Sequence, residues 1–113
     1  MNLSFVHFPG FTADWKHFRL NDEDLQALEQ LVLKNPQGGA VVAGTGGLRK
    51  MRFAPPSRRS GKSGACRVGY FWLPIGDMVY FLSIFAKADH ANLTSEQKAA
   101  FKKAIDGIKA MPG

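Results

Sequence analysis

The residues of this chain that could do chemistry are cations, and they gather in one stretch. Residues 46–70 contain seven of the fifteen Lys and Arg side chains and no Asp or Glu. Successive side chains of a β-strand point to opposite faces. The segments LRKMRFA and CRVGYFWL read as neighbouring strands, and alternation along them predicts that Lys50, Arg52 and Arg67 share one face of a sheet.

A cationic face of this kind suits RNA, which carries its own nucleophile, the 2′-hydroxyl. The planar fork of arginine matches phosphate oxygens and can stabilise the extra negative charge of a phosphorane. A lysine can move a proton if crowding by other cations favours its neutral form, and Lys50 beside Arg52 and Arg67 is placed for such crowding. A basic strand pair is more often a non-catalytic surface for nucleic acid or a protein partner, so the residues alone leave both interpretations open.

The connection between the two basic strands extends the positive charge. Its sequence, PPSRRSGKSG at 55–64, is rich in Gly, Ser and Pro, which predicts a loop. Arg58, Arg59 and Lys62 make this loop a basic flap beside the strands, and we expect all three to contact RNA.

Other kinds of catalytic site find little support in the sequence. His7, His17 and His90 lack the spacing of metal ligands, so neither a metal nor another cofactor is expected. The single cysteine, Cys66, stands at the start of an apolar run and is interpreted as a small core residue, with a catalytic thiol as the alternative. Five of the nine acids cluster at 14–29, well away in sequence from the basic strands.

The overall composition bounds the class of protein. A chain of 113 residues with 45% hydrophobic residues is predicted to form one domain, 1–113, with a real core. A net charge of +6 favours polyanionic partners such as nucleic acid, the ribosome or an acidic protein. The N-terminus lacks the features of a signal peptide, no apolar run approaches about 20 residues, and one cysteine suggests a reducing compartment. We therefore expect a cytoplasmic protein with no membrane partner.

Hydrophobic periodicity and turn residues predict an α+β fold. The expected order is a strand, one or two helices, three consecutive strands and a closing helix. The N-terminal part is predicted to contain a strand at 3–8, a short helix at 11–18 capped by Thr12, and a helix that is capped by Asn21 or Asp22 and stopped at 35–39. The remaining segments are strands 48–54, 66–73 and 78–87, followed by a helix that starts with the capping box Thr94–Gln97. Short connections favour an antiparallel meander of the last three strands, joined by the N-terminal strand, with helices packed on one face.

These motifs, taken in order, resemble the RelE/HigB superfamily of bacterial toxins, most of all its HigB-like branch. The similarity rests on GTGGLRKMRFA, the basic Gly/Ser loop, CRVGYFWL and VYFLSIFAKADHANLTSEQKAAF, and it runs from about Gly44 to Phe101. The resemblance implies a RelE-like fold with a central antiparallel sheet. It also implies an mRNA interferase: the toxin of a type II toxin–antitoxin pair, an endoribonuclease that cuts mRNA in the ribosomal A site without a metal.

The resemblance also assigns residues. It maps the cationic catalytic set onto Lys50, Arg52, Arg67 and Lys87. Lys50 is the general base or charge stabiliser, Arg52 and Arg67 bind the phosphate, and Lys87 acts on the phosphate or the leaving oxygen. Arg49, on the other alternation phase, is a further candidate for RNA contact. Phe85 stands where relatives usually have tyrosine; it can stack on a base but cannot exchange a proton. His90 is a candidate acid or base in its place.

The implied partners are the ribosome with its mRNA and a cognate antitoxin that presents carboxylates to the basic face, of helix-turn-helix type. Two alternatives stay open: a module of the same fold that binds RNA or the ribosome without cutting, and an interaction domain whose basic patch meets only an acidic protein.

Overall fold

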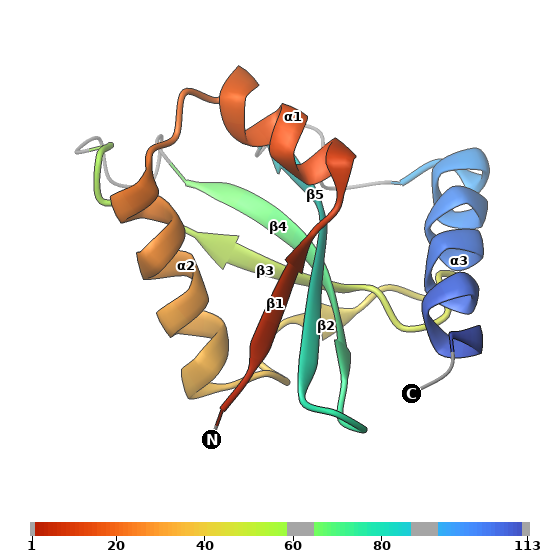
Figure 1. The fold of residues 1–113 in the computed structure, drawn as a ribbon. Coiled ribbons are helices and arrows are strands. Elements are labelled where there is room, and N and C mark those ends of the chain that lie inside the picture. The colour runs from red at the N-terminus through yellow and green to blue at the C-terminus, as the bar shows by residue number, and fades with distance from the viewer. Residues whose placement is uncertain (1, 59–64, 87–92, 112–113) are drawn as a thin grey trace.

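A five-stranded sheet lies between two helical layers (Figure 1). The computed structural model describes residues 2–58, 65–86 and 93–111. Within them the elements are β1 (Ser4–His7), α1 (Pro9–His17), α2 (Asp22–Lys34), β2 (Ala40–Val41), β3 (Arg49–Phe53), β4 (Cys66–Leu73), β5 (Met78–Ala86) and α3 (Ser95–Ala110). The predicted α+β class is thereby confirmed.

The sheet has the strand order β1-β5-β4-β3-β2. Strands β3, β4 and β5 form the antiparallel meander that their short connections predicted. The fully antiparallel sheet that we expected is wrong at β1, which pairs parallel with β5 and makes the sheet mixed. Parallel neighbours need a long crossover, and the chain supplies one by passing through α1 and α2 before the meander begins. The short strand β2 was not predicted.

Helices cover both faces of the sheet, so the prediction of helices on one face is also wrong. Helices α1 and α2 pack on one face over a cluster that includes Phe11, Leu28, Val68 and Phe81. Helix α3 packs on the other face through a second cluster: Leu48, Phe71, Tyr80, Leu82, Phe85, Leu93, Ile105 and Ile108. The cause lies in β4 and β5, which carry apolar side chains on both faces and therefore need two covers.

Local capping explains where the helices begin. Asn21, one of the two predicted caps of α2, forms a reciprocal capping box with Asp24, and Thr94 and Gln97 form the predicted box at the start of α3. Helix α1 begins earlier than expected because Pro9 occupies a first-turn position, where its missing N–H costs nothing. The predicted cap, Thr12, therefore lies inside the helix.

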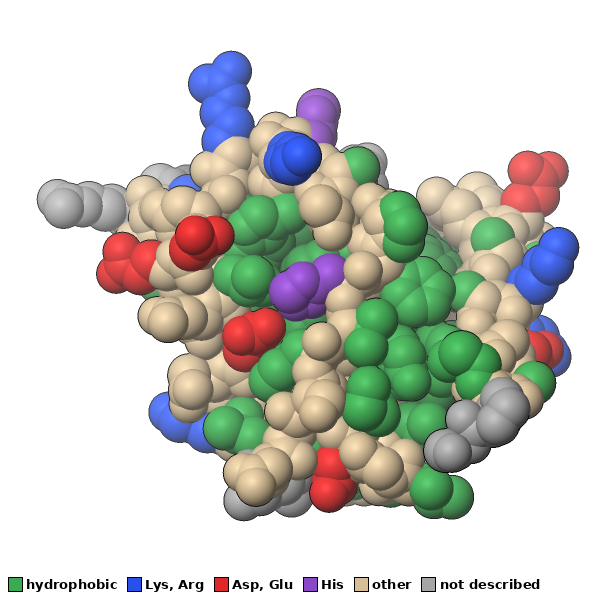
Figure 2. Space-filling view, in the orientation of Figure 1, with side chains coloured by type: hydrophobic (Ala, Val, Ile, Leu, Met, Phe, Trp, Pro, Cys, Tyr) green, Lys and Arg blue, Asp and Glu red, His purple; other side chains and the backbone are tan. Residues whose placement is uncertain are grey.

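An apolar hollow lies between the β4–β5 hairpin and the C-terminal end of α3. Figure 2 shows hydrophobic side chains gathered on this side of the molecule, with Lys and Arg around the rim of the view. The hollow has a volume of about 360 Å³ and is lined by Leu73, Ile75, Gly76, Met78, Tyr80, Ile108 and Met111. In the ranges that the structure describes, no helix is long and apolar enough to cross a membrane.

Candidate nucleic-acid interface

The strand register assembles a cationic row on the sheet face that α3 covers in part. Arg52 of β3 lies directly opposite Arg67 of β4, and Arg67 lies opposite Phe85 of β5. Side chains in such positions share a face, with Cβ atoms about 4.5–5.5 Å apart. Lys50 stands two residues before Arg52 on the same face, opposite Gly69. We call Lys50, Arg52 and Arg67 the cationic row; alternation predicted its shared face.

Within the described ranges, neither arginine of the cationic row has a carboxylate partner. Arg52 is exposed, while Lys50 and Arg67 are half-buried. The ion pairs found in those ranges join His7 to Glu29 and Lys102 to Asp106. Arg67 Nη1 lies in long contact with the carbonyl of Cys66, at 3.4 Å. Because like charges directly opposite one another destabilise a sheet, an anion bound here would relieve the repulsion.

Phe85 closes the row on the α3 side. Its side chain is only 8% exposed, and its ring meets Phe101 of α3 edge-on at 6.0 Å between centroids. The ring also lies over Gly69, where an added Cβ would come within 3.2 Å of it. Phe85 therefore forms an apolar wall beside Arg67. Stacking on an RNA base, its predicted role, would require α3 to move.

Arg49 lies on the other face of β3 and has a structural task. Its Nη1 donates hydrogen bonds to the carbonyls of Gln37 at 3.2 Å and Gly39 at 2.8 Å. The neighbouring Tyr70 hydroxyl donates to Pro36 at 2.9 Å and accepts from the N–H of Gly39 at 3.0 Å. Burial raises the pKa of Tyr70 above its usual value. Arg49 thus fixes the connection after α2 and stands apart from the cationic row.

Arg58 is also drawn away from the row. Its guanidinium donates to the carbonyl of Phe18, just after α1, and lies over the Phe18 ring at 6.0 Å. Phe18 packs against the cluster under α1 and α2, on the face opposite α3. The remaining predicted site residues lie outside the described residues: Arg59, Lys62, Lys87 and His90.

The start of the basic loop is held by Asp24, a buried acid in the first turn of α2. The Asp24 carboxylate is fully buried and accepts hydrogen bonds from the Ser57 N–H at 2.9 Å and hydroxyl at 2.6 Å, and from the Asn21 N–H at 3.0 Å. Burial alone would raise the pKa of Asp24, but these hydrogen bonds and the charge of Arg58 hold it below its ordinary value. The contact between Asp24 and Ser57 was not predicted, because no sequence pattern links two residues 33 positions apart.

Cys66 is placed as a core residue, as predicted. It is buried, and its Sγ contacts the carbonyl of Phe53 at 3.6 Å. Burial raises the pKa of the Cys66 thiol, although Arg58 and Arg67 act in the opposite direction. In the part of the chain that the structure describes, no three His, Cys, Asp or Glu side chains are grouped so as to hold a metal ion.

The fold and this site define a small α+β domain with a cationic sheet face. No protein-family model matches the chain. Membership of the RelE/HigB superfamily therefore stays a prediction that rests on the motifs.

Proposed function

We propose that this protein is an RNA-cleaving toxin of the RelE-like kind, which binds the phosphate backbone of mRNA on the cationic row. The observation that carries the proposal is the placement of Arg52 directly opposite Arg67, with Lys50 on the same face. Within the described ranges neither arginine has a carboxylate partner. A phosphate diester is the chemical group that best completes such a pair, because each guanidinium can donate to its oxygens in a planar, bidentate manner.

The proposed reaction is attack by the 2′-hydroxyl on the adjacent phosphorus, with no metal or other cofactor. The two arginines bind the phosphate oxygens and stabilise the additional charge of the phosphorane. Lys50 accepts the proton of the 2′-hydroxyl or stabilises charge. Lys87 acts on the phosphate or the leaving oxygen, and His90 is the candidate acid. The roles of Lys87 and His90 rest on the family resemblance.

The proposed partners are those that the family resemblance implies, and each of them suits the positive charge of the row. The ribosome presents mRNA in its A site, and a cytoplasmic location is part of this proposal. The antitoxin is an acidic, helix-turn-helix protein from the adjacent gene, whose carboxylates neutralise the row. The five acids at 14–29 lie on or near α1 and α2, which pack on the sheet face opposite the row.

A second candidate function is RNA or ribosome binding without cleavage. The state of Phe85 favours it: the residue has no hydroxyl, is 8% exposed, and packs on Phe101. This leaves one group fewer for proton transfer at the row, while the phosphate-binding arginines are unaffected.

A cell-free translation reaction separates the two. We expect the purified protein to inhibit translation and to produce message cut at codon positions, mapped by primer extension. Arg67→Gln should abolish cleavage, whereas Lys34→Gln, which removes one exposed charge at the end of α2, should not. Inhibition without cut message would support the binding module. Translation unaffected by the wild-type protein would overturn both and favour a domain that binds only an acidic protein.

A further inference from the structure

The lysines of α3 are not equivalent in their contacts. The stems of Lys98 and Lys102 lie on residues 44–47, which we call the glycine loop. A Cβ added at Gly44 would be 3.6 Å from Lys98 Cδ, and one added at Gly46 would be 3.6 Å from Lys102 Cγ. Lys103 follows Lys102 directly and is exposed on another side of the helix.

The glycine loop is held in a defined conformation. Gly44, Gly46 and Gly47 have φ values of 80°, 76° and 124°, in the region that favours glycine. Thr45 is fully buried; its hydroxyl donates to the carbonyl of Val42 at 2.6 Å and accepts from the N–H of Leu48 at 3.0 Å. The loop therefore offers a firm base for the lysine stems, whose charged ends reach solvent.

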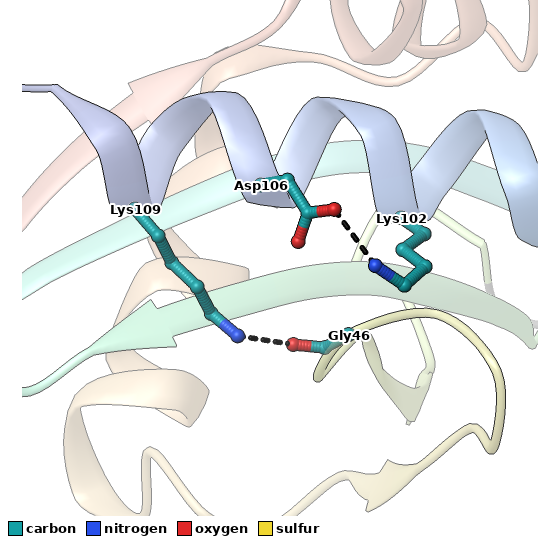
Figure 3. A network of polar contacts seen from close by, with 4 residues as sticks. All are labelled: Gly46, Lys102, Asp106 and Lys109. Atoms are coloured by element: carbon teal, nitrogen blue, oxygen red, sulfur yellow. Dashed lines mark hydrogen bonds and ion pairs between the residues drawn. The ribbon is translucent and has the colours of Figure 1, made fainter.

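A third lysine fixes the helix on this loop. Lys109 Nζ donates to the carbonyl of Gly46 at 2.8 Å (Figure 3). The same Nζ lies 5.6 Å from the centre of the Phe71 ring. The side of α3 that carries Lys98 and Lys102 is thus held toward the loop.

The glycine loop leads directly to the cationic row. Leu48 packs under α3, and Lys50 follows two residues later on the same face of the sheet. Gly46 and Lys50 are four positions apart, so at most about 13 Å separates their Cα atoms. An RNA strand bound at Lys50 can therefore reach the glycine loop within a few nucleotides.

From this arrangement we propose that Lys98 and Lys102 form a second phosphate-binding segment, so that one RNA strand runs from the cationic row over the glycine loop to α3. The ligand class is single-stranded RNA several nucleotides long. The inference rests on the proposed function, because it extends the same site. These lysines bind the strand away from the cleaved bond; they are binding residues and not catalytic ones.

Asp106 competes with an RNA phosphate for the ammonium group of Lys102. Lys102 Nζ lies 2.8 Å from Asp106 Oδ2, with side-chain exposures of 56% and 52% (Figure 3). Exposed pairs of this kind contribute little to stability, so a phosphate can replace the carboxylate at low cost. Removing the carboxylate by Asp106→Asn should therefore strengthen RNA binding, the opposite sign to removing a lysine.

The test is fluorescence anisotropy with a labelled single-stranded RNA of mRNA sequence and with a trinucleotide too short to span the whole surface. The variant is Lys98→Gln with Lys102→Gln, since glutamine keeps much of the stem that packs on the loop. Its matched control is Lys34→Gln with Lys103→Gln, which removes the same charge elsewhere. Urea unfolding of each variant checks that the fold is retained.

We expect the Lys98/Lys102 variant to bind the long RNA more weakly than the matched control, with trinucleotide binding equal in the two. The slope of log affinity against log salt should be smaller in magnitude by about 1.4 in the Lys98/Lys102 variant than in the matched control, because each lost phosphate contact accounts for about 0.7. Equal affinity and slope in the two double variants would overturn this inference while leaving the cationic row in place. Failure of the wild-type protein to bind RNA would overturn both proposals.

Discussion

Arg52 lies directly opposite Arg67 on the neighbouring strands β3 and β4, with both side chains on the sheet face toward α3. Two like charges in this relationship oppose strand pairing. The pairing survives because Met51, Phe53 and Val68 on the other face belong to the core under α1 and α2. Packing on one face of the sheet thus keeps two like charges close together on the other face, where a bound anion would offset their repulsion.

Replacing Arg52 with glutamine should raise the free energy of unfolding while weakening RNA binding. The expected gain is about 0.2–1 kcal/mol at low salt, the usual contribution of one cross-strand charge pair. It should shrink at 1 M salt, where the screening length falls to about 3 Å. Urea unfolding at both salt concentrations measures the effect.

Arg49→Gln is the control for this experiment. It removes the same charge from the same strand but loses hydrogen bonds to Gln37 and Gly39. We expect it to lower the free energy of unfolding by about 1 kcal/mol. A less stable Arg52→Gln protein at low salt would show that Arg52 and Arg67 do not repel.

Asp24 should make stability depend on acid pH. Its pKa in the folded protein is held below the ordinary value, so its contribution is complete above the unfolded pKa of about 3.9 and is lost as pH falls through the folded pKa. Asp24→Asn should cost about 1–3 kcal/mol at pH 7, because donors of Ser57 and Asn21 lose a charged acceptor. The difference in free energy of unfolding between Asp24→Asn and the wild-type protein should narrow below about pH 4.

Urea unfolding across this pH range tests the assignment, with Asp22→Asn as the control. Asp22 occupies the same first turn of α2 but is exposed. If Asp22→Asn changed the acid limb of the profile as much as Asp24→Asn, the buried carboxylate would not be the group responsible.

Cys66 should behave as an inert core thiol. Because burial raises its pKa, a thiol reagent at pH 7 should label it slowly in the native protein and rapidly in urea. Cys66→Ala should lower the free energy of unfolding by about 1 kcal/mol or more and leave RNA cleavage intact. A folded Cys66→Ala protein that has lost cleavage would revive the catalytic-thiol interpretation.

Structural elements that depend only on residues near one another in the sequence were predicted correctly from local patterns. The strand Cys66–Leu73 has the predicted bounds, and Asn21 and Thr94 cap their helices as expected. The shared face of the cationic row also followed, because alternation and a short connection suffice to set it.

The features that we did not predict from the sequence depend on packing between residues far apart in the chain. Nothing local distinguishes a parallel β1 from an antiparallel one, and the face chosen by α3 depends on both sides of β5 being apolar. Arg49 and Arg58 looked available for RNA by charge alone. Their contacts with carbonyls distant in the sequence, at Gly39 and Phe18, could be seen only in the fold.

Two glycines, Gly46 in the glycine loop and Gly107 in α3, should respond with opposite signs to replacement by alanine. Gly46 has φ of 76°, so Gly46→Ala should cost about 1–2 kcal/mol even though its Cβ would make only ordinary contacts at 3.6 Å. Gly107 lies inside α3 with nothing within 4 Å of an added Cβ, and Gly107→Ala should stabilise the protein by about 0.5–1 kcal/mol. Urea unfolding measures both.

Because Lys109 of α3 binds the carbonyl of Gly46, strain in the glycine loop should also loosen the helix. Amide exchange in α3 should therefore quicken in Gly46→Ala and not in Gly107→Ala. Unchanged exchange in α3 would mean that the glycine loop does not hold the helix that carries Lys98 and Lys102.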